Sequence, residues 1–260
     1  MYTVTSRDGT TIAFERSGDG PPIVFVTGAF NDRYTCAPLA GLLASRFTVI
    51  TYDRRGRGDS GDAAPYAVQR EIEDLDAVIE EAGGAAFVFG YSSGAVLALK
   101  AAAHGSAITK LAVYEPPVPL GHTGPSLDLA AEIAELVSAG RRGDAVEAFQ
   151  TRAVGLPAEV VAQIRTSPMW PGLEKMAHTL VHDLTITGDP ALTEELGSVK
   201  IPTLVLDGAV TWDSVRQAAT AIAAALPRGD RRTLPGGENH HIDPAATAPV
   251  LGEFFTVDPV

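Results

Sequence analysis

The feature that most constrains this chain is the stretch 85–97, which is a short apolar strand pattern followed by a sharp turn and a helix of small residues. Ser92 lies at the turn in a Gly-x-Ser-x-Gly pattern with Gly90 and Gly94. A serine between a strand and a helix occupies a tight, strained turn that lifts its hydroxyl clear of the sheet. The pattern predicts a nucleophilic Ser92, with the amide of Ser93 facing the group that Ser92 attacks. The alternative is an ordinary glycine–serine turn in a doubly wound sheet.

Composition excludes several classes of partner. The formal net charge of −12 disfavours nucleic acid and anionic membrane surfaces, because both would be repelled. The lone cysteine, Cys36, excludes an intrachain disulfide and a cysteine-based metal site, and it fits a reducing cytoplasm. The first residues show no secretory signal pattern, and no apolar run approaches the length of a membrane span. We therefore expect a cytoplasmic protein that acts on a small molecule.

The first half of the chain alternates between strand and helix patterns. An N-terminal hairpin turns at Asp8-Gly9 between alternating stretches, and further short apolar runs precede and follow predicted helices. The strands are expected at 2–6, 11–16, 23–26, 47–51 and 108–114, and the helices at 33–45 and from Val68 to Gly83. This alternation predicts an α/β fold with a mostly parallel, doubly wound sheet.

The alternation breaks after Glu115-Pro116-Pro117. Only helical patterns follow, at 127–139, 144–153, 157–165 and 172–184. Strand and helix patterns then resume at 203–207, 213–226, 231–234 and 245–255. The break predicts a core made of residues 1–117 and 198–260, with a helical cap of residues 118–197 inserted after the sixth strand and lying over the carboxyl ends of the strands.

Along essentially its whole length the chain resembles the α/β-hydrolase family. The matching features are the Gly28 loop after the third strand, Asp53-x-Arg55-Gly56-x-Gly58-x-Ser60 after the fourth, the turn at Ser92, the cap and a histidine loop before the last helix. The resemblance implies the fold but no particular substrate. Dehalogenases and epoxide hydrolases of this family carry aspartate at the turn. A serine there implies esterase, lactonase or amidase chemistry through an acyl-enzyme.

The resemblance places the catalytic histidine in the loop 234–244, which holds His240 and His241. We favour His240, because related loops carry histidine four residues before the proline that starts the helix, here Pro244. His241 remains the alternative and is otherwise a solvated neighbour.

The other histidines indicate no metal. His104 closes the helix after Ser92 and is interpreted as structural, and His122 is predicted to lie at the entrance to the cap. His178 and His182 are one helical turn apart, but no third ligand is evident, so pocket or surface positions are preferred. We expect neither a metal nor an organic cofactor.

The acid departs from the usual family pattern. The family places an aspartate three residues after the glycine that follows the seventh strand, but three residues after Gly208 stands Thr211. Asp207 and Asp213 are nearby but out of place, and Asp213 also suits a helix start. Some members, among them the zearalenone-type lactonases, carry a glutamate at the end of the sixth strand, where this chain has Glu115. We therefore prefer Glu115 and keep Asp213 as the alternative.

The oxyanion hole is expected to combine the amides of Ser93 and Ala29, with Phe30 as the alternative second donor. The arginine-rich loop 53–60 is interpreted as structural, with Asp53 and Arg55 bound to neighbouring loops. Residues expected at the substrate pocket are Phe30, Trp170 and His178. An apolar stripe on the cap is most often simple packing against the core, and where part of it lines a pocket over Ser92 it favours an apolar substrate moiety.

The predicted function is that of a serine hydrolase that cleaves a carboxylic ester or lactone with an apolar moiety. One alternative is another reaction on the same triad, such as that of a lyase, a perhydrolase or a carbon–carbon bond hydrolase. The other is a non-catalytic ligand-binding protein with a degenerate triad. The sequence leaves the substrate and the oligomeric state open.

Overall fold

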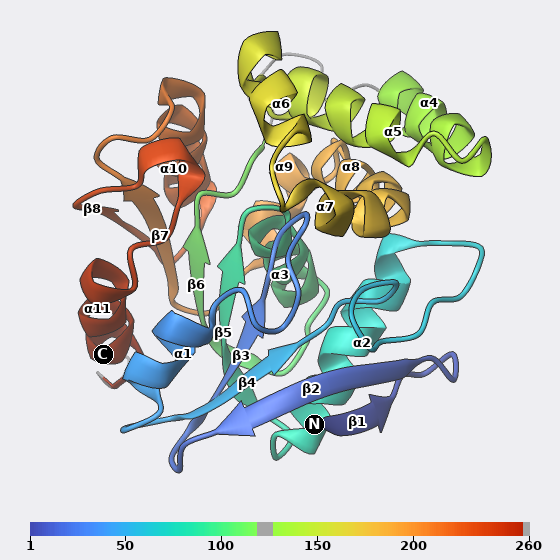
Figure 1. Cartoon of the computed structure of the whole chain (residues 1–260). Coiled ribbons are helices and arrows are strands. Elements are labelled where there is room, and N and C mark those ends of the chain that lie inside the picture. The colour runs from blue at the N-terminus through green and yellow to red at the C-terminus, as the bar shows by residue number, and fades with distance from the viewer. Residues whose placement is uncertain (119–126, 257–260) are drawn as a thin grey trace.

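The computed structural model describes residues 1–118 and 127–256. An eight-stranded sheet runs through it in the order β1-β2-β4-β3-β5-β6-β7-β8. Strands β3 to β8 are parallel, whereas β2 pairs antiparallel with both β1 and β4 (Figure 1). The bounds are β1 (Tyr2–Thr5), β2 (Thr11–Ser17), β3 (Pro22–Val26), β4 (Thr48–Tyr52), β5 (Ala86–Tyr91), β6 (Ile108–Tyr114), β7 (Thr203–Gly208) and β8 (Gly229–Leu234). The predicted fold class is confirmed.

Successive side chains of a strand point to opposite faces of the sheet. Because both faces carry apolar side chains, both are covered by helices. In β3, Val24 and Val26 join the apolar cluster of one face, whereas Ile23 and Phe25 join that of the other. The first face is covered by α2 (Val68–Glu81), α3 (Ser93–Ala103) and α10 (Asp213–Ala225), and the second by α1 (Ala37–Leu43) and α11 (Pro244–Thr256).

The helices between β6 and β7 form a third layer over the end of the sheet toward which the arrows of β5 and β6 point (Figure 1). We call α4 to α8 the cap. Its elements share a separate apolar cluster and are α4 (Leu127–Ser138), α5 (Arg142–Ala148), the π-helix η1 (Phe149–Ala153), α6 (Ala158–Arg165), α7 (Trp170–Met176), the 3₁₀-helix η2 (Ala177–Thr179) and α8 (Leu180–Thr187).

After the cap the chain returns to the sheet through α9 (Leu192–Glu195) and the 3₁₀-helix η3 (Leu196–Ser198), whose Leu192 and Leu196 pack in the cluster that contains α3. A further 3₁₀-helix, η4 (Glu238–His240), precedes α11. In the described ranges 1–118 and 127–256, no helix is both long enough and apolar enough to cross a membrane.

Three helix predictions differ from the structure. The helix predicted at 33–45 is limited to α1, because Arg33 is buried and its amide donates to Asp53 Oδ1 at 2.8 Å, which holds this part of the chain as a loop. The helix predicted at 144–153 changes to π-helix at Phe149, and the one predicted at 172–184 is broken by η2. His122 lies outside the described residues.

Candidate active site

Ser92 joins β5 to α3 with φ 56° and ψ −127°, a conformation that is strained for a residue with a side chain. Its amide donates to the Tyr114 carbonyl at 3.0 Å, which anchors the turn to β6. The flanking glycines are required by close backbone contacts: a Cβ on Gly90 would lie 2.6 Å from the Cα of Ala95, and a Cβ on Gly94 would overlap the Val26 carbonyl. The predicted strand, turn and helix are therefore present, with Ser92 at the apex.

Backbone strain gathers around this turn. Among the described residues, the non-glycine residues with positive φ are Phe30, Ser92, Glu115 and His240, at 58°, 56°, 48° and 64°. They come from four separate segments of the chain, and each is one of the residues singled out from the sequence. Such conformations persist only where the surroundings enforce them, and they concentrate at functional sites. Their coincidence marks this end of the sheet as the candidate site.

The structure brings His240 and Glu115 together: Nδ1 of His240 is hydrogen-bonded to Oε2 of Glu115. Glu115 is fully buried, and its Oε1 accepts a 2.8 Å bond from the amide of Gly208. In the tautomer whose Nδ1–H donates to this carboxylate, Nε2 is the ring nitrogen left for another partner. The hydroxyl of Tyr91 donates to the His240 carbonyl at 2.7 Å, and the Trp212 ring stacks on the imidazole at 5.8 Å.

The alternative acids and base lie elsewhere. Asp207 is buried and bound by Arg231 at 2.8 Å and by the hydroxyl of Thr233. Asp213 is exposed at the start of α10, as its helix-start interpretation predicts. His241 is exposed, and its carbonyl accepts a bond from Tyr114. The carboxylate that is hydrogen-bonded to His240 is therefore that of Glu115.

The loop after β3 lies directly against the turn at Ser92. A Cβ on Gly28 would approach the Cβ of Ser92 to 2.7 Å, so a glycine is needed there. Ala29 and Ser93, the predicted oxyanion donors, line one cavity together with Ser92 and His240. The structure thus gathers the five predicted catalytic and oxyanion residues at a single site.

This cavity has a volume of about 790 Å³ and lies between the sheet and the cap. Its wall is largely apolar, and Phe30 and Phe149 meet edge to face at 5.5 Å. Gln150 lines it from the π-helix η1, and its buried Oε1 has no hydrogen-bond partner. Single π-helical turns often accompany functional sites, and a buried amide oxygen without a partner is costly.

Two predicted pocket residues do not line the cavity, which corrects the sequence interpretation. Trp170 is buried within the cap's own apolar cluster. His178 lies in η2 and bonds through Nε2 to the Gly56 carbonyl at 2.8 Å, with Arg142 donating to its Nδ1 at 2.8 Å. Leu184 of α8 lines the cavity instead.

His182 also has no metal partner cluster. Its ring stacks on Tyr66 with centroids 3.9 Å apart, and burial lowers its pKa below the usual value. Across the described parts of the chain, no group of three or more histidine, cysteine, aspartate or glutamate side chains is arranged to hold a metal ion.

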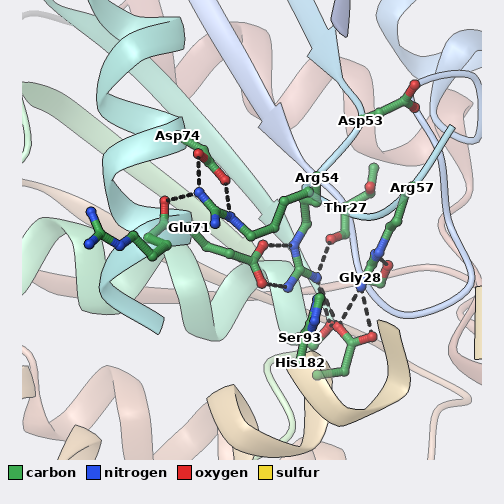
Figure 2. Close-up of polar contacts among 12 residues, drawn as sticks. Thr27, Gly28, Asp53, Arg54, Arg57, Glu71, Asp74, Ser93 and His182 are labelled. Atoms are coloured by element: carbon green, nitrogen blue, oxygen red, sulfur yellow. Dashed lines mark hydrogen bonds and ion pairs between the residues drawn. The ribbon is translucent and has the colours of Figure 1, made fainter. Parts of the chain in front are cut away.

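The arginine-rich loop contributes more than its structural interpretation suggested. Arg54 is fully buried and forms a two-bonded ion pair with Glu71 of α2 (Figure 2). Its Nη1 also donates to the Thr27 carbonyl at 3.2 Å and to Oδ1 of Asp183, in cap helix α8, at 2.8 Å. This one side chain therefore joins helix α2, the loop after β3 and the cap.

Arg57 completes this cluster. Its Nη1 donates to the Gly28 carbonyl (Figure 2). Its Nη2 donates to both carboxylate oxygens of Asp183, at 2.8 and 2.7 Å. The hydroxyl of Ser93 donates to the same carboxylate at 2.6 Å. Burial alone would raise the pKa of Asp183, but Arg57 and Arg54 lower it to about 2, so the carboxylate stays ionised.

Sequence reasoning missed Asp183 as a partner of the site. Its contact with Arg57 joins residues 126 positions apart. Two features of the sequence pointed toward this contact. One is a charged residue on the apolar stripe of the cap, and the other is the set of arginines in the loop 53–60. Neither signal names the partner.

Comparisons with known proteins agree with the observed fold. The family model described as the alpha/beta hydrolase family matches residues 23–250. A solved α/β hydrolase from Sphaerobacter thermophilus DSM 20745 is 52% identical, covers 98% of this chain and 100% of that chain, and has a TM-score of 0.91. An enol-lactonase from Burkholderia xenovorans LB400 has the same fold at 21% identity, with a TM-score of 0.73 over 98% of this chain and 100% of that chain.

Among curated proteins, the uncharacterized hydrolase YraK of Bacillus subtilis (strain 168) is 37% identical over 95 residues, which is 35% of this chain and 35% of that relative. The match spans only about a third of that relative's length. The family model, in contrast, extends over most of the chain and over both the core and the cap. The chain belongs to the alpha/beta hydrolase family.

Proposed function

We propose that this protein is a serine hydrolase that cleaves a carboxylic ester or lactone with an apolar moiety. The observation that carries the proposal is the hydrogen bond between His240 and the buried Glu115, in the wall of a cavity that Ser92 also lines. A nucleophile, a base and an acid that orients the base are the three parts that such chemistry needs. They follow one another along the chain in the order serine, acid, histidine.

In the first half of the reaction, Nε2 of His240 accepts the proton of the Ser92 hydroxyl while the oxygen attacks the substrate carbonyl carbon. The amides of Ala29 and Ser93 stabilise the negative charge that develops on the carbonyl oxygen. His240 then returns the proton to the departing alkoxide oxygen, which leaves an acyl group on Ser92. Glu115 holds the imidazole in the required tautomer and stabilises its cationic form.

In the second half, His240 accepts a proton from water while the water oxygen attacks the acyl-enzyme carbonyl. The second tetrahedral intermediate uses the same two amides. His240 protonates the Ser92 oxygen as the carboxylic acid leaves. Neither half requires a metal or an organic cofactor.

The cavity wall supports an apolar acyl or alcohol group beside the reacting carbonyl, because Phe30, Phe149 and Leu184 line it. Gln150 adds one polar position, which a hydroxyl group of the substrate would satisfy. The fold is shared with an enol-lactonase, so a cyclic ester is compatible with this architecture. A core of residues 1–117 and 198–260, a cap of residues 118–197 and a cytoplasmic location complete the proposal.

The test is a panel of nitrophenyl esters of increasing acyl length together with simple lactones, using wild type and Ser92→Ala. We expect measurable hydrolysis by wild type, with kcat/KM rising with acyl length, and at least about a thousandfold loss in Ser92→Ala. Equal rates in both proteins would contradict the proposal. Product identification separates simple hydrolysis from lyase, perhydrolase and carbon–carbon cleavage reactions, and inactivity on the whole panel would favour a ligand-binding protein.

A further inference from the structure

Resting on the proposed function, we propose that Arg57 and the cap residue Asp183 are positioning residues of the oxyanion hole. Arg57 holds the carbonyl of Gly28, and Asp183 holds Arg57. Through these contacts the cap fixes the direction of the amide that receives the developing negative charge.

The first step of the argument is the planarity of the peptide bond. The carbonyl of Gly28 and the N–H of Ala29 belong to one rigid trans unit, so they point in opposite directions. A donor that fixes the Gly28 oxygen therefore fixes the Ala29 N–H as well. Arg57 supplies that donor from the loop after β4, on the side of the peptide away from the N–H.

The second step is that one carboxylate is linked to both predicted donors, to Ala29 through Arg57 and the Gly28 carbonyl and to Ser93 through its hydroxyl. Asp183 binds Arg57 through both oxygens, and it accepts the hydroxyl of Ser93, whose own amide is the other donor. Arg54 reinforces the arrangement by binding Asp183 and the Thr27 carbonyl, the peptide preceding Gly28. The two halves of the oxyanion hole come from segments far apart in sequence, and they are tied together through the cap.

The third step concerns the cost of this cluster. Arg54, Arg57, Asp183 and Glu71 are each no more than 1% exposed. Buried ion pairs are weak sources of stability, because desolvation offsets most of their attraction. The placement of the donors affects catalysis directly, since an oxyanion hole stabilises charge through dipoles that are already oriented before the reaction. The cluster is accounted for by precise placement of the Gly28–Ala29 peptide.

The same loop provides a matched control. Arg55 is as buried as Arg57 and forms a bidentate ion pair with Asp74 of α2. Its Nε and Nη2 each donate to one carboxylate oxygen at 2.7 Å. Its other contacts are to Asp8 and to the carbonyl of Arg70, none of which lines the active-site cavity. Arg55→Met therefore breaks a comparable buried ion pair without changing any residue that lines the active-site cavity.

The experiment compares Arg57→Met with Arg55→Met on the best ester of the panel. Both acylation and deacylation use the oxyanion hole, so we expect Arg57→Met to lower kcat and kcat/KM together, by roughly 10- to 100-fold, with KM nearly unchanged. It should also weaken binding of a boronic acid, which forms a tetrahedral adduct on serine, by a similar factor. Arg55→Met should lose thermal stability but keep kcat within about twofold of wild type.

Two further variants decide the matter if Arg57→Met does not fold. Arg57→Lys keeps the charge and one donor, and we expect it to recover part of the lost kcat. Ser93→Ala keeps the backbone amide but removes its bond to Asp183, and we expect a smaller loss in kcat with unchanged KM. If kcat in Arg57→Met equals that in Arg55→Met, or if Arg57→Lys and Ser93→Ala both behave as wild type, the inference is wrong. The proposed function fails separately, through equal activity of wild type and Ser92→Ala.

Discussion

The ends of strands β6 and β7 are neighbours in the sheet, yet they hold their carboxylates for opposite purposes. At the end of β6, Glu115 directs one oxygen to His240 and the other to the Gly208 amide. At the end of β7, Asp207 is occupied by Arg231, and Thr211 stands where the family commonly has its acid. The difference lies in the atom that each carboxylate reaches: the glutamate of β6 contacts the imidazole of His240, whereas the aspartate of β7 contacts a guanidinium.

The largest expected effect is at β6. In Glu115→Gln the amide oxygen is required by the Gly208 N–H, so the side-chain NH₂ faces Nδ1 of His240 and selects the wrong tautomer. We expect kcat to fall roughly 10³- to 10⁴-fold with little change in the melting temperature. Steady-state kinetics beside Asp213→Asn, which should remain within about twofold of wild type, provides the check. A strong loss in Asp213→Asn alone would reverse the assignment.

The second effect concerns the carboxylate of β7 itself. Asp207→Asn removes the charge that faces Arg231, a side chain that is 29% exposed and can be solvated in part. We expect the free energy of unfolding to fall by about 1–2 kcal/mol while kcat stays within about twofold. Denaturant titration and the ester assay measure these two quantities on the same sample. A hundredfold loss in kcat at unchanged stability would show that β7 contributes to the chemistry after all.

The smallest effect is expected at the position the family's acid would occupy. The hydroxyl of Thr211 is buried and has no hydrogen-bond partner, so Thr211→Val removes only an unsatisfied polar group. Stability should stay level or rise by up to about 1 kcal/mol, with unchanged kcat. A loss of activity in this variant would mean that the β7 end still serves His240.

The fold could be predicted well because its signals are local. Apolar runs such as 203–207 and the turn at Ser92 identify strands and their order along the chain, and the cap follows from the absence of strand patterns after Pro117. Helix ends were less predictable. Arg33 continues a helical pattern in the sequence, but its ion pair with Asp53, twenty residues later, holds it in a loop.

The residues of the candidate site also differ in how well they could be predicted from the sequence. The turn at Ser92 could be predicted from its own segment, whereas His240 and Glu115 were predicted from the resemblance to the family. Asp183 could not, because nothing near it in the sequence indicates that two arginines from the loop 53–60 will meet it. The pocket prediction for His178 failed for a related reason: the residue lies in a short 3₁₀ segment that the apolar pattern does not reveal, and it bonds to the Gly56 carbonyl, 122 residues away.

The most direct test of the central claim is covalent labelling with an alkyl fluorophosphonate, followed by peptide mass spectrometry. An activated serine displaces fluoride and keeps the phosphonyl group on its oxygen. We expect one adduct per chain, on the peptide that contains Ser92, with no adduct in Ser92→Ala and much slower labelling in Glu115→Gln. Labelling of another residue at the same rate in Ser92→Ala, or a wild-type enzyme that hydrolyses esters but is never labelled at Ser92, would contradict the account.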